Sequence, residues 1–279
     1  MINDQASLGT AWRTASQRID RLDARLLLEQ VASCHHADLM ARPEQALSLD
    51  QALRYESWVA RRATGEPLAY LLESADFYGL EFLVSPAVLI PRPDTEVLVD
   101  IALAKAAALA TPRIVDLGTG SGIIAVMLAR LCPAARLTAV DSSPGALEVA
   151  RHNARRHDVH IDFLLGNWYQ PLGQARFDLI VANPPYVRAG DAHLRLNGLP
   201  FEPQGALTDG VADGDGLACI RAIISGVQDH LLPGGCLFIE HGYDQAAQVR
   251  ALLREQGGAD VASWRDLAAI ERVSGARWP

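Results

Sequence analysis

Hydrophobic and polar positions change their pattern near residue 95. Before it, the segment 19–33 carries apolar residues at near-helical spacing, which predicts an amphipathic helix: Ile19, Leu22, Leu26, Leu27 and Val31. A second helix is predicted after Ser48, because Ser48 and Gln51 form a capping box in which each side chain pairs with a backbone N–H of the first turn. Nothing here alternates as a strand does, so we expect a helical domain over residues 1–75.

Short apolar runs separated by helix-length stretches follow from about residue 95. Runs that are apolar on both faces are typical of parallel strands buried between helices. They cover residues 113–118, 136–141, 161–166, 177–183 and 235–242, and the C-terminal stretch 261–278 has the length for two closing strands. We therefore expect a doubly wound, mostly parallel, seven-stranded α/β sheet in a domain over residues 95–279.

Residues 76–94 separate the two regions. They contain short extended pieces, Gly79, and the prolines Pro86, Pro91 and Pro93, which interrupt any helix. We expect a hairpin connector here.

Composition and charge exclude several classes of protein. An apolar fraction of 49% over 279 residues can supply a core without crosslinks. The four cysteines form no C-x-x-C pair, and the adjacent Cys34, His35 and His36 diverge on a helix, so we predict neither disulfides nor a metal site. The first residues lack an apolar h-region and no apolar run reaches membrane length, so we expect neither a secretion signal nor a membrane span. We expect a cytoplasmic protein, and the net charge of −8 argues against direct nucleic-acid binding.

A glycine-rich loop follows the first predicted strand. The sequence "DLGTGSG" covers residues 116–122 and leads into an apolar helix. Its glycines allow a tight turn and a close approach of the backbone to a ligand. The third glycine comes one residue too early for a dinucleotide fingerprint, and there is no P-loop lysine. The loop favours a nucleoside or amino-acid moiety, and its candidate contacts are Gly118, Thr119, Gly120, Ser121 and Gly122.

Two further residues are candidates for a nucleoside site. Asp141 ends the second predicted strand, where a carboxylate can bind both hydroxyls of a ribose or simply cap the next helix. Trp168 follows the third strand and can flank an adenine ring or belong to the core. Together with the glycine loop, these residues resemble the S-adenosylmethionine (AdoMet) site of a Rossmann-like methyltransferase.

The fourth predicted strand ends in "NPPY", residues 183–186. The side-chain oxygen of Asn183 and the carbonyl of Pro184 can accept both N–H protons of a planar nitrogen, so that its lone pair faces a methyl donor. Two prolines suit this role because they fix φ and donate no N–H. We predict that Asn183 and Pro184 are catalytic, that Pro185 and Tyr186 complete the substrate site, and that Asn183 also contacts the cofactor. A plain turn at a strand exit is the alternative.

These residues alone leave the target open. NPPY serves adenine or cytosine amino methyltransferases acting on DNA or RNA as well as glutamine methyltransferases. A non-catalytic nucleoside-binding module is a third hypothesis.

A longer set of motifs narrows the choice. GEPLAY, FYG, PRPDTE, NPPY, FEPQGAL, DGDGL and IEHG begin at residues 65, 77, 91, 183, 201, 213 and 239. In this order and spacing the chain resembles the HemK/PrmC family from the N-terminal helices to the last strands. The resemblance implies transfer of a methyl group from AdoMet, without a metal, to the glutamine of the Gly-Gly-Gln motif in peptide chain release factors. It implies a helical domain that helps to hold the factor, and AdoMet contacts at Gly118, Gly120, Gly122, Asp141, Trp168 and Asn183. We expect a monomer.

The chain departs from the family pattern at two residues. Glu73 stands where relatives often have glycine, and Asn167 where they often have an acidic residue. The segment 91–96 either lines the cofactor cleft or begins a helix. Glu202 either orders the substrate loop or lies on its surface. His241 is not assigned as a base, because the expected mechanism needs none.

Overall fold

The computed structural model describes residues 6–196 and 198–279. They form two compact units, one that ends at Ser74 and one that spans Ala75–Pro279. Each unit is built around its own buried apolar cluster or clusters.

The first unit is helical. It contains α1 (Leu8–Ala15), α2 (Arg21–Ala32), α3 (His36–Ala41), α4 (Leu49–Ala63) and α5 (Leu68–Leu72). The predicted capping box opens α4, since Ser48 Oγ accepts from the Gln51 N–H at 3.2 Å and Gln51 Oε1 accepts from the Ser48 N–H at 2.9 Å. Fully buried leucines of α1 and α2 meet Val59 of α4, and these contacts give the unit its core.

A two-stranded hairpin follows, in agreement with the hairpin connector predicted from the sequence. Strands β1 (Ser74–Phe77) and β2 (Leu80–Leu83) pair with each other, and Tyr78 and Gly79 between them both have positive φ. Such a pair matches the two-residue turn that suits the twist of a hairpin. After it come a 3₁₀ turn η1 (Pro93–Thr95) and helix α6 (Glu96–Ala106).

The large sheet has seven strands in the order β5-β4-β3-β6-β7-β9-β8. Its members are β3 (Arg113–Leu117), β4 (Arg136–Asp141), β5 (Asp162–Leu165), β6 (Phe177–Ala182), β7 (Leu231–Glu240), β8 (Ala259–Arg265) and β9 (Glu271–Arg277). Strands β3 to β7 pair in parallel, and β9 runs antiparallel to both β7 and β8. The predicted doubly wound, mostly parallel sheet is confirmed.

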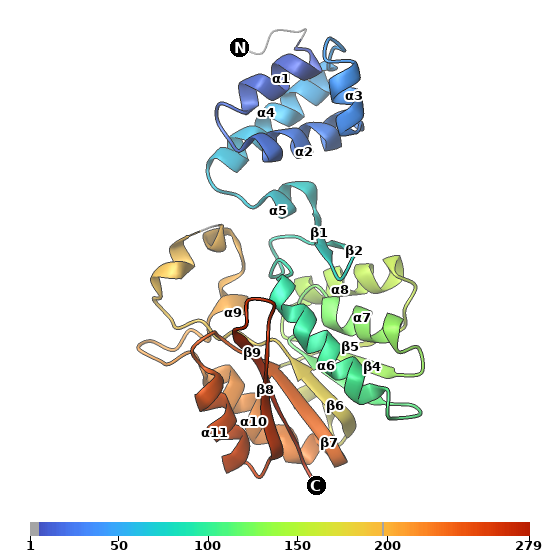
Figure 1. Ribbon diagram of the computed structural model, residues 1–279, viewed down its shortest axis with the longest axis vertical. Helices are drawn as coiled ribbons and strands as arrows, with labels where there is room; N and C mark the ends of the chain where they lie inside the picture. Colours follow the sequence, from blue (N-terminus) through green and yellow to red (C-terminus); the bar gives the residue numbers. More distant parts are fainter. Residues whose placement is uncertain (1–5, 197) are drawn as a thin grey trace. The chain divides into compact units, whose positions relative to one another are not determined.

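Helices cover both faces of this sheet (Figure 1). One face packs under α6, α7 (Ile123–Leu131) and α8 (Pro144–Arg156), and the other under α10 (Ala218–His230) and α11 (Ala246–Glu255). Along β6, Leu179 and Val181 face the first cluster while Ile180 and Ala182 face the second. Alternate residues therefore enter opposite cores, which is why the strands are continuously apolar in sequence.

The connection between β6 and β7 contains most of the remaining short elements. They are η3 (Ala192–Arg195), η4 (Leu199–Phe201) and α9 (Gln204–Leu207), while η2 (Gln170–Leu172) follows β5. Strands β4 and β5 are added on one side of β3, and β6 and β7 on the other. The order thus reverses between β3 and β6, where sheets of this kind bind ligands at the carboxyl ends of their strands. Among the described residues, no helix is long and apolar enough to cross a membrane.

Candidate active site

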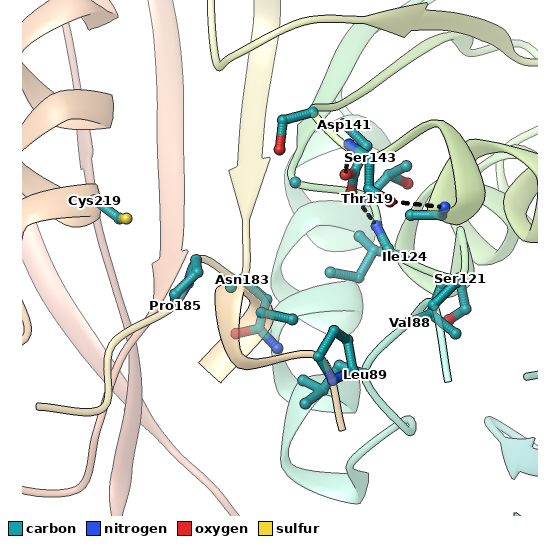
Figure 2. A pocket seen from close by; sticks show the side chains of 18 of the residues that line it. Val88, Leu89, Thr119, Ser121, Ile124, Asp141, Ser143, Asn183, Pro185 and Cys219 are labelled. Carbon is teal, nitrogen blue, oxygen red and sulfur yellow. Dashed lines mark hydrogen bonds between the residues drawn. The ribbon is translucent and has the colours of Figure 1, made fainter. Parts of the chain in front are cut away.

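A cavity of about 450 Å³ lies at this reversal point in the second unit (Figure 2). Its walls come from the segment after the hairpin, the ends of β3 to β6, and the loop that contains α9. They bring together these residues of the sequence prediction: Gly118, Thr119, Gly120, Ser121, Asp141, Trp168, Asn183 and Pro185. Gly122, Pro184 and Tyr186 are not among the lining residues. In the described part of the chain, no group of three or more His, Cys, Asp or Glu side chains could hold a metal ion.

The glycine loop wraps back onto the end of β4. The N–H groups of Gly118 and Thr119 donate to Val140 O at 2.8 and 3.0 Å, and the Gly120 N–H donates to Asp141 Oδ2 at 2.8 Å. These N–H groups are thus occupied by the protein, and the loop presents its backbone surface to the cavity. Gly122, at φ 83°, begins α7 so close to α8 that a Cβ would lie 3.0 Å from the Ala150 Cβ.

The Asp141 carboxylate is held by backbone groups on two sides. Its Oδ1 accepts from the Ser143 N–H at 2.9 Å, and its Oδ2 accepts from Gly120. Ser143 Oγ, not Asp141, caps α8 by accepting from the Ala146 N–H. Asp141 is only half-buried and lines the cavity, so its oxygens retain lone pairs for a ligand.

A second carboxylate lies beneath the loop and was missed from the sequence. Asp116, on β3, is fully buried, and its Oδ2 accepts from Thr119 Oγ1 at 2.6 Å. Burial, reinforced by the nearby Asp141, raises the pKa of Asp116 to about 7. Trp168 follows β5 at φ 48°, and its ring lies 3.3 Å from where a Cβ on Gly118 would be. The indole therefore packs against the glycine loop at the edge of the cavity.

Asn183 projects from the end of β6 into the cavity (Figure 2). Its Nδ2 donates to Thr95 Oγ1 at 3.2 Å. Pro184 is buried, and Pro185 lines the cavity. Tyr186 is directed elsewhere: its ring packs partly buried against the second core cluster, and its hydroxyl donates to Glu240 Oε1 at 3.3 Å. Burial and the Glu240 charge raise the pKa of Tyr186, so this phenol stays neutral.

The backbone of NPPY is held by contacts from the following loops. Gln245 is buried, donates from Nε2 to Tyr186 O at 3.0 Å and to Asp215 O at 3.3 Å, and accepts from the Gly242 N–H at 2.8 Å. Gly216, at φ 75°, lies so close that a Cβ would be 2.4 Å from Tyr186 O. The DGDGL and IEHG motifs thus fix the exit of the NPPY strand.

The PRPDTE segment both lines the cavity and begins a helix, so both hypotheses about it describe part of the structure. Arg92 pairs with Glu202 at 2.5 Å, and Glu202, only 4% exposed, also accepts from the Ile90 N–H at 3.0 Å. Asp94 pairs with Arg272 of β9 at 3.1 Å. Glu96 Oε1 accepts from the Tyr78 N–H of the hairpin. Glu202 therefore ties the loop before α9 to the opposite cavity wall.

Two buried groups lie near the site without lining it. Asn153 of α8 donates from Nδ2 to Leu83 O at 3.0 Å and to Ser121 O at 2.8 Å, joining the hairpin to the glycine loop. His241 is fully buried between Ser274 Oγ and Gly242 O, and burial lowers its pKa. Because it does not line the cavity, it is not placed as a catalytic base.

The fold and the site define a Rossmann-like methyltransferase. The methyltransferase small domain matches residues 93–198, and the PrmC N-terminal domain matches residues 12–72. The 16S rRNA methyltransferase RsmC of T. thermophilus, solved with AdoMet and guanosine, shares the fold with a TM-score of 0.54, at 22% identity over 74% of this chain and 50% of that chain.

Two curated relatives identify the particular family. The release factor glutamine methyltransferase of Bordetella pertussis is 48% identical over 94% of this chain and 96% of its own length. That of Burkholderia pseudomallei is 48% identical over 94% of this chain and 93% of its own. The chain belongs to the release factor glutamine methyltransferase family, and the resemblance to HemK/PrmC is confirmed.

Proposed function

We propose that this chain transfers a methyl group from AdoMet to the side-chain nitrogen of the glutamine in the Gly-Gly-Gln motif of peptide chain release factors. Family membership supports the reaction. One structural observation supports this cavity as the site of the reaction. The Asn183 amide and the Asp141 carboxylate both line it, at the carboxyl ends of β6 and β4.

The cavity fits AdoMet in size and in chemistry. About 450 Å³ lies within the usual range for small-molecule sites. Asp141 presents a carboxylate whose orientation is fixed by two backbone N–H groups, which suits the two hydroxyls of a ribose. Trp168 offers an aromatic surface for the adenine beside the glycine loop. When bound, AdoMet supplies an electrophilic methyl group on a sulfonium sulfur.

Asn183 supplies the acceptor that a carboxamide nitrogen needs. The lone pair of such a nitrogen is delocalised into its carbonyl, as the barrier of about 18–20 kcal/mol to amide rotation shows. Asn183 Oδ1 accepts one of its two N–H protons. The backbone carbonyl of Pro184 accepts the other, since it lies between the lining residues Asn183 and Pro185 although Pro184 itself does not line the cavity. Together the two acceptors turn the lone pair out of the amide plane. The chain then contributes orientation and proximity, and the proton is released to water after transfer.

Tyr186 has an indirect role in this scheme. Because its hydroxyl is bound to Glu240 and its ring packs against the core, Tyr186 holds the NPPY strand in place from behind. The substrate glutamine is bounded instead by Asn183, Pro185 and the loop that Glu202 tethers. The helical unit up to Ser74 is assigned to holding the release factor, in keeping with its match to the PrmC N-terminal domain.

The test is methyl transfer from labelled AdoMet to a purified release factor. Wild-type factor should take up label, and a factor with Gln→Ala in Gly-Gly-Gln should not. Duplex DNA and RNA, assayed side by side, should remain unlabelled. Equal labelling of both factors, or label on nucleic acid alone, would overturn the proposal.

A further inference from the structure

Thr95 contacts Asn183 and lies near a second buried side chain, Glu240. Thr95 ends η1 and is 1% exposed, and its Oγ1 accepts the hydrogen bond from Asn183 Nδ2. Glu240, at the end of β7, is also 1% exposed, and its Oε1 accepts from the Tyr186 hydroxyl at 3.3 Å. The pKa of Glu240 responds to the Thr95 side chain, so the two buried groups are near one another.

The amide nitrogen of Asn183 is the donor in this contact, with Nδ2 3.2 Å from Thr95 Oγ1. Nδ2 is the only part of the Asn183 side chain that donates. A hydroxyl has one proton, so Thr95 Oγ1 accepts from Nδ2 and directs its own proton away from Asn183.

We propose that Thr95 is a positioning residue that determines which atom of the Asn183 amide meets the substrate. The oxygen and nitrogen of an amide are nearly the same size, so packing alone does not distinguish the two orientations. With Nδ2 held by Thr95, Oδ1 is left for the cavity. In the reversed orientation, the Asn183 amide would present its N–H groups to the N–H groups of the substrate. It would then offer them no hydrogen-bond acceptor. This inference rests on the proposed function, in which the substrate nitrogen carries two protons.

The surroundings of Thr95 allow its hydroxyl to be tested separately from its position. Asp94 pairs with Arg272, and the Glu96 side chain binds the hairpin. These neighbours hold η1 in place without the Thr95 hydroxyl. Thr95→Val keeps the shape and removes the hydroxyl, while Thr95→Ser keeps the hydroxyl. Thr138→Val, on β4 and outside the cavity lining, is a matched control for the same replacement.

The full chain is assayed with AdoMet and a release factor. Thr95→Val should lower kcat about tenfold or more, while the AdoMet dissociation constant changes less than about threefold. Thr95→Ser and Thr138→Val should stay within about threefold of wild type in kcat. Wild-type turnover in Thr95→Val, a loss in Thr95→Ser as large as that in Thr95→Val, or a loss confined to KM would overturn the inference.

A readout without turnover separates this inference from the proposed function. In ¹⁵N-labelled protein, the Asn183 side-chain NH₂ signal is assigned by its absence in Asn183→Ala. It should shift in Thr95→Val and keep its wild-type position in Thr95→Ser. An unmoved signal in Thr95→Val would overturn the inference even if methyl transfer occurs. Absence of methyl transfer by wild type would contradict the proposed function and leave this signal to decide the role of Thr95.

Discussion

Glu73 has a left-handed backbone conformation, with φ of 55°, at the C-cap of α5. Its N–H donates to Ala69 O, so this conformation closes the end of the helix. Glycine is the residue that adopts this conformation without a steric cost from Cβ. The departure noted in the sequence, glutamate where relatives often have glycine, is therefore a position of backbone strain.

Glu73→Gly should stabilise the helical unit by about 1 kcal/mol, because the cost of left-handed backbone is removed. Glu73→Ala keeps the Cβ and should leave stability within about 0.5 kcal/mol of wild type. Urea unfolding of the three proteins measures both. Equal gains from glycine and alanine would assign the effect to the lost carboxylate, contrary to this explanation.

Residue patterns predict local features well and long-range partners poorly. The capping box of Ser48 and the turn at Gly79 are visible because their partners are near in sequence. Thr95 and Glu202 are not, because they bind groups 88 and 112 residues away. Asp116 resembles any polar residue at a strand end, and only the fold shows that it is fully buried. The site assignments of Asn183 and Asp141 stay predictions until they are tested by mutation.

At the scale of elements, the site residues lie at the carboxyl ends of the strands, and the following loops hold these strand ends in place. The five parallel strands were predicted from their apolar runs, and β7 alone begins much earlier than expected, at Leu231 instead of residue 235. The reason is the sequence Pro233-Gly234-Gly235, which reads as a turn, although Leu231 pairs with Phe177 before the register shifts. The motifs after NPPY (FEPQGAL, DGDGL and IEHG), in contrast, form no regular pattern in the sequence. In the structure, their residues hold the loops around the cavity and the exit of the NPPY strand in place.

The contacts of Glu202 with Arg92 and with the Ile90 N–H lead to a prediction for the cavity wall. Glu202→Ala removes both the ion pair with Arg92 and the acceptor for the Ile90 N–H, so the loop before α9 loses its tie to the opposite wall. AdoMet affinity should fall about tenfold, equivalent to about 1.4 kcal/mol. Calorimetric titration measures this, with Glu148→Ala, exposed on α8, as the control. Unchanged affinity in Glu202→Ala would show that the tie does not shape the site.

At the scale of the whole molecule, two buried carboxyl groups oppose folding at neutral pH. Burial raises the pKa of Glu240 to about 7, with hydrogen bonds from Thr95 and Tyr186 and the charge of Arg272 acting against the rise and Asp94 adding to it. Asp116 behaves similarly. Between the unfolded pKa near 4.5 and about 7, the folded state binds more protons than the unfolded state. The free energy of unfolding contributed by these groups therefore falls as pH rises.

Glu240→Gln should remove one of these two contributions, because the amide resembles the protonated carboxyl. Relative to wild type, the variant should gain about 2 kcal/mol in free energy of unfolding between pH 5 and pH 8. Because both proteins keep Asp116, the free energy of unfolding of both still depends on pH through this residue. Urea unfolding followed by circular dichroism at the two pH values gives the difference. If the difference in free energy of unfolding between Glu240→Gln and wild type did not change with pH, Glu240 would be ionised over the whole range.

The division of the chain into two units suggests separate tasks. The unit from Ala75 contains the whole cavity, and the helical unit up to Ser74 has its own core. Docking of the release factor by the helical unit and the monomeric state both stay predictions.

We propose above all that Asn183 presents a glutamine nitrogen to the AdoMet methyl group. Tandem mass spectrometry of a release factor, incubated with AdoMet and either wild type or Asn183→Ala, tests it most directly. We predict one methyl group on the glutamine side chain of Gly-Gly-Gln with wild type, and its near-complete absence with Asn183→Ala, which should still bind AdoMet. A methyl group on another residue, or undiminished methylation by Asn183→Ala, would contradict the account.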